Sequence, residues 1–467
     1  MLVVMIGAIF IGFPISFTLL FLALAFGYLG LGDVVFSLAY FQTIGMMKEE
    51  LLAAVPLFIL MGYVTEQAGL MERLFTALRH LLAPIRGSLF AVVILTATIF
   101  AMATGIVGAA VTVLGIMAAP IMVRAGYDAR LSAGCITAGG TLGILIPPSV
   151  MLIVMGPVLG VSVADLYAAC VGPGLTLAAM YLVYLLGRAM LNPKLGPSVP
   201  REQRVHSAAT SAQEVVIGVV PLLALIAAAL GSILTGVATP TEAAAVGAFG
   251  AILLAAGYRK LTYAAFKRAL LATTATSSMV LLLAVTSNIF GAVFSRLGTA
   301  GWITETMLAL PLPPVAMLVV VILLIFVLGW PFEWPAIVLV FLPIFYPVVA
   351  ALKGDLGSAL GIAPDFMLVW FGALVAVTLQ TAFLSPPVAM SAYYLRQVVR
   401  AWSLATIYKG MFEFMLLQCI AIVLLVVFPV IATGLPEKLR EAAAAVKTEQ
   451  IDDSVNRLEE DPLKGLR

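Results

Sequence analysis

The chain has 467 residues, of which 63% are apolar and only 10% are charged. Soluble domains carry about 45–50% apolar and about 25% charged residues, so this composition excludes an ordinary soluble protein. The 25 basic residues nearly balance the 23 acidic ones, which leaves no positive excess for nucleic acid. Three cysteines and two histidines do not form a disulfide framework or a CxxC metal motif. We therefore expect an all-α polytopic membrane protein embedded in a lipid bilayer.

Residues 1–86 are predicted to form N-terminal scaffold helices and an amphipathic arm. Residues 2–31 carry no charge and form a first membrane segment, bent at the Gly-Phe-Pro motif of residues 12–14. A second span is expected over residues 53–68. The stretch that follows, 71–86, is polar and amphipathic, and forms the arm.

Residues 87–187 are predicted to form the first half of a transport domain. Residues 87–123 are 37 uncharged residues with a break near Gly105, and basic residues flank them on both sides. One long tilted helix would measure about 55 Å, against a bilayer core of about 30 Å. The basic flanks also favour the same side of the membrane. A re-entrant helical hairpin is therefore favoured over a single helix.

A broken helix and a span complete this half. Residues 131–163 are apolar, but Gly139-Gly140 and Pro147-Pro148 interrupt them, and 166–186 forms a span. Adjacent prolines remove two amide donors and force the helix to open. The polar connector that follows, 188–214, is predicted to be cytoplasmic and divides the chain into two halves.

Residues 215–312 are predicted to form further scaffold helices and a second arm. Spans are expected over 215–234, 243–256 and 269–294, with a basic stretch at 258–268. Before the second of these spans, the motif Thr239-Pro-Thr-Glu242 predicts a capping box with proline at the first helical position.

Residues 313–434 repeat the pattern of the first half. Residues 315–351 are again uncharged except for Glu333, with a break at Gly329-Trp-Pro. A helix broken at Ser385-Pro-Pro follows, and then a last span over 412–430. The polar tail, 435–467, is expected to be flexible or a loose surface helix.

The same order of elements in both halves predicts an inverted repeat with two re-entrant hairpins and two Pro-Pro-broken helices. Sixteen of the 25 lysines and arginines fall in the stretches assigned to one face, against three on the other. The positive-inside rule makes the first face cytoplasmic. The first hairpin then opens from the cytoplasm and the second from outside, as an inverted repeat requires.

Open backbone at membrane depth is tolerated only beside protein or a water-filled cavity. Discontinuous helices direct amide ends at anions and carbonyl ends at cations near the midplane. The two tips and the two openings therefore predict a site for a carboxylate together with sodium. Its candidates are Thr104, Gly105, Gly108, Gly140, Thr141, Gly143, Pro147, Ser149, Gly329, Glu333, Thr378, Gln380, Thr381, Ser385 and Pro386.

Each candidate also has a structural interpretation. Glycines in membrane helices mostly serve packing, and Ser or Thr hydroxyls mostly bond to carbonyls of their own helix. Glu333 is interpreted as the only acid deep in an apolar run, which favours a functional role. The alternative for Glu333 is a water-exposed hairpin tip or a helix cap between two tryptophans.

At these motifs the chain resembles the large membrane subunit of tripartite ATP-independent periplasmic (TRAP) transporters. The resemblance covers residues 1 to about 435. It is carried by Ala138-Gly-Gly-Thr-Leu-Gly-Ile-Leu-Ile-Pro-Pro-Ser149, Ala238-Thr-Pro-Thr-Glu-Ala243 and Leu379-Gln-Thr-Ala-Phe-Leu-Ser-Pro-Pro387. It implies a sodium-driven importer of organic acids in the bacterial inner membrane, working by an elevator-type cycle. It also implies a periplasmic substrate-binding protein and a small four-helix membrane subunit as partners.

The resemblance further implies sodium sites shared between each hairpin tip and its opened helix. The sodium residues would be Thr104, Gly105, Gly108, Gly140, Thr141, Gly143, Pro147, Gly329, Glu333, Thr378, Thr381 and Ser385, and the substrate residues Thr104, Ser149, Gln380, Thr381 and Pro386. The chain departs from the family at Ile106 and Val107, where members often carry small hydroxyl residues. Any hydroxyl ligand from the first tip is then restricted to Thr104.

Two other functions compete with this one. A stand-alone sodium-dicarboxylate carrier shares the hairpins and proline motifs. An integral-membrane transferase would need clustered acids or a positioned acid–base pair, and the predicted spans carry no such cluster. We therefore expect no enzyme activity, and no cofactor other than sodium as the coupling ion.

Overall fold

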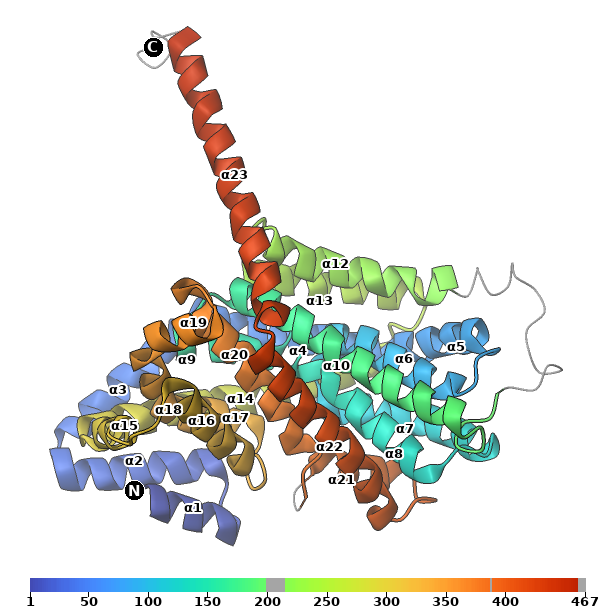
Figure 1. Cartoon of the computed structure of the whole chain (residues 1–467), viewed down its shortest axis with the longest axis horizontal. Coiled ribbons are helices and arrows are strands. Elements are labelled where there is room, and N and C mark those ends of the chain that lie inside the picture. Colours follow the sequence, from blue (N-terminus) through green and yellow to red (C-terminus); the bar gives the residue numbers. More distant parts are fainter. Residues whose placement is uncertain (199–214, 387–388, 461–467) are drawn as a thin grey trace.

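The structure is a computed structural model that describes residues 1–198, 215–386 and 389–460, with side chains except at 2, 101, 103, 104 and 446–460. Within these ranges every regular element is a helix (Figure 1). Nine of the described helices are long and apolar enough to cross a membrane. The prediction of an all-α polytopic membrane protein is confirmed.

The N-terminal region begins with two helices, α1 (Leu2–Ile11) and α2 (Ile15–Leu31). They are separated at the predicted motif, because Gly12 takes a positive φ of 105° and Pro14 precedes the first turn of α2. The next elements are α3 (Val34–Met47), the 3-10 turn η1 (Glu50–Ala53), α4 (Ala54–Gln67) and the amphipathic α5 (Leu70–Leu82).

Helix α4 belongs to an outer group of helices. The group also contains α2, α3, α12 (Val220–Leu234), α13 (Pro240–Gly257) and α14 (Tyr263–Arg296). Both α13 and α14 pack on α4, and α14 also packs on α2 and α3. The predicted capping box starts α13: the Thr239 amide donates to Glu242 Oε2 at 2.8 Å, and the Glu242 amide donates to Thr239 Oγ1 at 3.3 Å.

The predicted span 269–294 lies within α14, which begins earlier, inside the basic stretch 258–268. α14 is one helix of 34 residues, and most of the basic stretch forms its first turns. The Thr262 hydroxyl caps this helix by accepting from the Ala265 amide. No proline or glycine interrupts the chain from there until Gly291, so nothing ends the helix where the charge pattern changes.

The inner group begins with α6 (Ser88–Thr104) and α7 (Val107–Arg124). The Leu89 amide donates to the Tyr127 hydroxyl at 3.3 Å, and the Phe90 and Tyr127 rings meet at 4.9 Å. The outer ends of the two helices are therefore adjacent, and the chain reverses at Gly105. The single-helix alternative for residues 87–123 is wrong.

The first half continues with a broken helix. Its parts are α8 (Ala129–Thr141), the 3-10 turn η2 (Leu142–Ile144) and α9 (Val150–Leu159), followed by α10 (Val163–Leu191). Of the connector 188–214, residues 199–214 lie outside the described residues.

The second half repeats this order of elements. After α15 (Thr299–Leu308) come α16 (Pro314–Leu328) and a helical return made of α17 (Trp334–Ala336), the π segment η4 (Ile337–Phe341) and α18 (Leu342–Ala351). Then follow α19 (Lys353–Leu360), α20 (Pro364–Gln380), the 3-10 turn η5 (Thr381–Phe383), α21 (Met390–Val398) and α22 (Leu404–Val427). Helix α20 is the most buried of the candidate spans and forms the centre of the core.

The two halves interlock. The return helix of the first hairpin, α7, packs on α21, the second arm of the other half's broken helix. In turn, η4 and α18 of the second hairpin pack on α9. The glycines allow this close packing: a Cβ at Gly115 would lie 2.9 Å from both Leu395 and Val398. The sequence pattern did not predict that the hairpin of each half packs on the broken helix of the other half.

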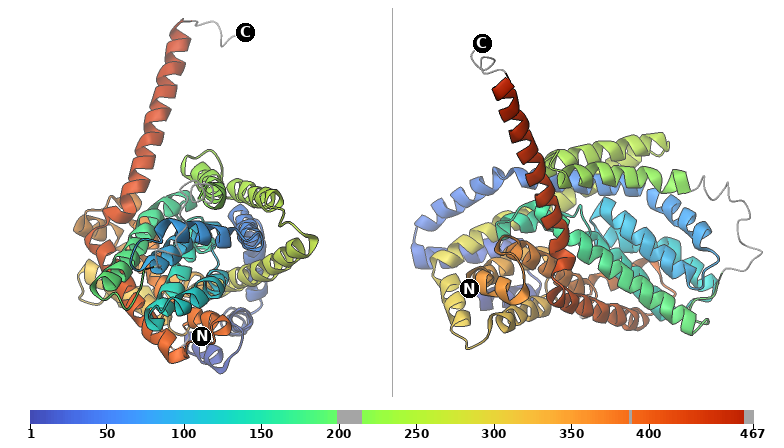
Figure 2. Two further views of the ribbon diagram at one scale, coloured as in Figure 1. Left: turned by 90° about the vertical axis from the view of Figure 1, so that its right-hand side faces the viewer. Right: turned by 45° about the horizontal axis from the view of Figure 1, so that its top comes forward.

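The C-terminal helix α23 (Val430–Glu460) leaves the helical body and projects away from it (Figures 1 and 2). Its base packs on α10 and α20. There Arg440 pairs with Asp165 at 2.5 Å and stacks over the Phe366 ring at 4.5 Å. The tail is thus a continuous helix as far as Glu460, and residues 461–467 lie outside the described residues.

Candidate functional site

The first hairpin turns at Gly105, whose φ of +61° is the left-handed conformation that favours glycine. A Cβ there would lie 3.7 Å from the Gly143 carbonyl oxygen and 3.8 Å from the Pro148 carbonyl oxygen. The tip therefore rests against the opening of the first broken helix. Residues of the first tip and of the first opening therefore lie side by side in the structure.

Gly140 brings the first hairpin and broken helix still closer. A Cβ at this position would overlap the Val111 side chain and lie 3.0 Å from the Val111 backbone nitrogen. Helices α7 and α8 thus touch backbone to backbone beside the tip. This contact gives Gly140 a packing role, independent of any role as a ligand.

The second hairpin repeats the arrangement. Gly329 ends α16, and a Cβ on it would lie 3.1 Å from Ala382 Cβ. Ala382 belongs to η5, the last turn before the second opening. The second tip and the second opening therefore also lie side by side.

A serine hydroxyl closes each opening. Ser149 donates to the Ile144 carbonyl across the first opening, and Ser391 donates to the Phe383 carbonyl across the second, both at 2.5 Å. Ser149 occupies the N-cap position of α9 but makes no side-chain cap bond there. Its hydroxyl is used across the opening, which leaves the first-turn amides of α9 without a cap.

The other predicted hydroxyl residues bond to nearby carbonyls. Thr141 donates to Ala138 at 2.8 Å, Thr378 to Leu374 at 2.8 Å, Thr381 to Thr378 at 2.6 Å and Ser385 to Thr381 at 2.7 Å. Their oxygen lone pairs remain available to accept or to coordinate a cation.

Gln380, at the end of α20, is fully buried. Neither its amide nitrogen nor its amide oxygen has a hydrogen-bond partner among the described residues. Buried amides almost always have partners, so this side chain is suited to bind a polar ligand or a water molecule.

A cavity of about 510 Å³, the tip cavity, lies where the hairpins and the broken helices meet the outer group. Helices α4 and α14 form one wall, with Tyr63 and Glu66 on the first and Thr276 on the second. The Tyr63 and Thr276 hydroxyls lie 3.1 Å apart and join the two helices. The described lining contains two carboxylates, Glu66 and Glu333, and no lysine, arginine or histidine.

Four helical runs begin at this cavity. The residues that line it include Val107, Val150, Trp334 and Met390, which start α7, α9, the run 334–351 and α21. None of these four starts has a side-chain cap bond within the described residues. First-turn amides carry a partial positive charge, and at these four starts no described side chain caps them.

The predicted site residues are distributed unevenly around this cavity. Gly105, Gly108 and Glu333 line it. A second group is buried and does not line the cavity, namely Gly140, Thr141, Gly143, Pro147, Ser149, Gly329, Thr378, Gln380, Thr381 and Ser385. Pro386 is exposed, and the Thr104 side chain lies outside the described residues. Glu333 is at an N-cap position but makes no cap bond there.

The interpretation of Glu333 as the only acid deep in an apolar run overlooked Glu66. Glu66 is on α4, near the end of a predicted span, and it faces the same cavity. Ile59, Tyr63 and Glu66 line the cavity together and follow the helical spacing i, i+4, i+7. That spacing on a mostly apolar helix was the sequence signal that could have identified Glu66 as a candidate site residue.

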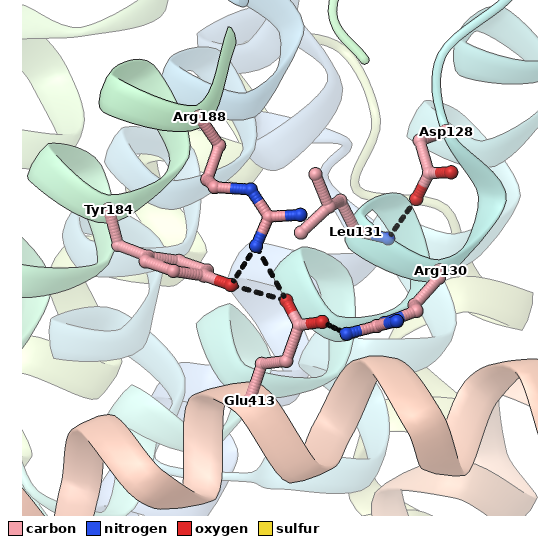
Figure 3. Close-up of polar contacts among 6 residues, drawn as sticks. All are labelled: Asp128, Arg130, Leu131, Tyr184, Arg188 and Glu413. Carbon is pink, nitrogen blue, oxygen red and sulfur yellow. Dashed lines mark hydrogen bonds and ion pairs between the residues drawn. The ribbon is translucent and has the colours of Figure 1, made fainter. Parts of the chain in front are cut away.

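A separate polar cluster joins three inner helices (Figure 3). The Glu413 carboxylate of α22 pairs with Arg130 of α8, and it accepts from the Tyr184 hydroxyl of α10. Arg188 lies 3.7 Å from the same carboxylate and donates to Tyr184 at 2.8 Å. Only 11% of the Glu413 side chain is exposed. The cluster does not line the tip cavity, and it links α8, α10 and α22.

Comparison with known proteins identifies related permeases. A family model described as "Tripartite ATP-independent periplasmic transporter, DctM component" matches residues 2–431. The sialic acid TRAP transporter large permease SiaM of Vibrio cholerae is 30% identical over 434 residues, which is 92% of this chain and 96% of that protein. The C4-dicarboxylate TRAP transporter large permease DctM of Pseudomonas aeruginosa is 29% identical, covering 83% and 86%.

Among solved structures, the YdaH transporter of Alcanivorax borkumensis superimposes with a TM-score of 0.59. The likeness covers 87% of this chain and 90% of that one at 18% identity. At this identity it shows a shared fold alone.

Proposed function

Because the chain belongs to the family of DctM components of tripartite ATP-independent periplasmic transporters, we propose that it is the permease subunit of a sodium-coupled importer of organic acids. As a TRAP permease it is a multi-pass protein of the bacterial inner membrane, and it is not an enzyme. Its relatives carry names for sialic acid and C4-dicarboxylates, which supports an acidic substrate.

The convergence of four uncapped helix starts on the tip cavity carries this proposal. Free first-turn amides are suited to bind an anion without a basic side chain. A substrate carboxylate would lie against these amides, at the interface of the two repeats.

Sodium would bind behind the substrate, at each hairpin tip. At the first tip, the carbonyl oxygens of Gly143 and Pro148 approach Gly105. Oxygen ligands of this kind suit a small hard cation. At the second tip, Glu333 supplies a carboxylate, and the Thr381 and Ser385 hydroxyl oxygens lie at the neighbouring opening. The bound cations would offset the repulsion between Glu333 and an incoming anion.

The arrangement along α14 supports an elevator-type movement with re-entrant hairpins. The tip cavity borders α14 at Thr276–Val280, and a second cavity of about 490 Å³ borders it further along, between Ala284 and Ser295. Hairpin residues line both cavities, including Trp334 in the first and Leu339 in the second. We propose that the inner group slides along α4 and α14, which act as the scaffold.

The proposed partners are a periplasmic substrate-binding protein, which delivers the acid, and a small four-helix membrane subunit, which supports the outer group. The test is uptake into proteoliposomes that contain both membrane subunits, with a sodium gradient and the cognate binding protein added outside. Uptake that needs both the gradient and the binding protein supports the proposal. Sodium-driven uptake without the binding protein would instead identify a stand-alone dicarboxylate carrier.

A further inference from the structure

The charged side chains around the tip cavity favour a positive group beside the substrate carboxylate. Its described lining has two carboxylates and no basic side chain. Glu333 belongs to a hairpin tip, where a coupling sodium would neutralise it. Glu66 lies on α4 across the cavity, and its Oε2 atom is buried without a hydrogen-bond partner among the described residues. An unpartnered buried carboxylate oxygen is stabilised when a hydrogen-bond donor or a positive group joins it.

No described cation of the protein supplies that group. The neighbouring Gln67 side chain accepts from Arg268 at 3.2 Å, but Arg268 does not line the cavity and makes no ion pair with Glu66 among the described contacts. A partner for Glu66 is therefore expected from the cavity itself.

Aromatic rings surround the same space. Tyr63 lies one turn before Glu66 on α4, Trp334 starts the return run of the second hairpin, and Tyr394 comes from α21. The Tyr394 ring is held over the first tip, because a Cβ at Gly108 would lie 3.0 Å from its Cζ atom. Carboxylates and aromatic faces in one cavity are the groups that bind ammonium and quaternary ammonium ions.

We propose that the cavity takes an organic acid that also carries an ammonium or quaternary ammonium group. This inference rests on the proposed function and names its substrate class. The carboxylate of the substrate lies at the uncapped helix starts of the inner group, and its cation lies between Glu66 and the aromatic rings. Glu66 is thus a specificity-determining residue, contributed by the scaffold side of the cavity.

The experiment measures ligand binding by the purified complex of the two membrane subunits without sodium and over a range of sodium concentrations up to saturation, without the soluble protein. Matched pairs of acids that differ only in the cationic group are compared by thermal stabilisation and calorimetry: succinate with aspartate, butyrate with 4-aminobutyrate, and 3,3-dimethylbutyrate with (trimethylammonio)acetate. We expect the cationic member of at least one pair to bind about tenfold more tightly, equivalent to about 1.4 kcal/mol. The Glu66→Gln variant should abolish that preference.

Two further variants separate a specific role from a folding defect. Glu66→Asp keeps the charge and should retain the preference. Glu72→Gln makes the same chemical change on the exposed face of α5 and should behave as the unmodified complex does. Equal or weaker binding of the cationic member in every pair would overturn the inference while leaving the proposed function intact. So would a Glu66→Gln variant that changes only the sodium affinity. If no acid binds in a sodium-dependent way, the proposed function itself fails.

Discussion

Replacing Glu413 tests whether the polar cluster of Figure 3 holds the inner helices together. Glu413→Ala removes the acceptor for two arginines and for the Tyr184 hydroxyl. Breaking a buried ion pair costs about 3–5 kcal/mol. Arg130 and Arg188, however, are 48% and 39% exposed, so water can solvate them after the change. We therefore expect a loss of about 2 kcal/mol.

The assay is thermal unfolding of the detergent-solubilised membrane complex, followed by tryptophan fluorescence. Glu413→Ala should lower the apparent Tm by several degrees, and Glu413→Gln by about half as much, because the amide still accepts from Tyr184. Glu305→Gln, an exposed acid on α15, is the matched control and should leave the Tm unchanged.

A double-mutant cycle with Arg130→Met gives the decisive result. If loss of the Glu413–Arg130 ion pair causes the destabilisation, the double variant should lose less stability than the sum of the losses in the two single variants. Strictly additive effects, or an unchanged Tm for Glu413→Ala, would refute the interpretation of this cluster as a clamp between α8, α10 and α22.

Three further predictions concern the hairpins. Gly140→Ala places a Cβ against Val111, so the free energy of unfolding should fall by about 2 kcal/mol, and both Tm and uptake should fall with it. Gly187→Ala is the control, because there is open space around that position, and it should leave Tm and uptake unchanged. Gly105→Ala has room for its methyl group but needs a positive φ, and should cost about 1 kcal/mol. Gly105→Asn should cost less in the same unfolding assay, and the reverse order would argue against strain as the cause. Glu333→Gln should raise the sodium concentration needed for half-maximal uptake several-fold, because one cation ligand loses its charge. Unchanged sodium kinetics would remove Glu333 from the site.

The predictions that succeeded depend on residues that act locally. Gly105 and Gly329 end helices, and Pro147 follows the last turn before an opening, whatever the rest of the fold does. Thr239 and Glu242 cap a helix through neighbours three residues apart. Such features can be read from short segments. The order of elements in the two halves was therefore predictable in detail.

The features that were missed depend on contacts between distant segments. The packing of α7 on α21 brings together residues almost 300 positions apart, and no local pattern specifies it. Glu66 was overlooked because a charge near a helix end usually faces water. Only the packing of α4 against the inner group turns that side chain towards the cavity. The length of α14 was missed because charge, and not a helix breaker, was used to place its start.

The projecting helix α23 offers a way to observe movement from outside the cavity. Its base is tied by the Arg440–Asp165 pair and by packing on α10 and α20, which belong to the inner group. Under the proposed movement of the inner group, the outer part of α23 is expected to move with these helices. A small rotation of the helices at its foot becomes a much larger displacement at its far end, where a distance probe would read it.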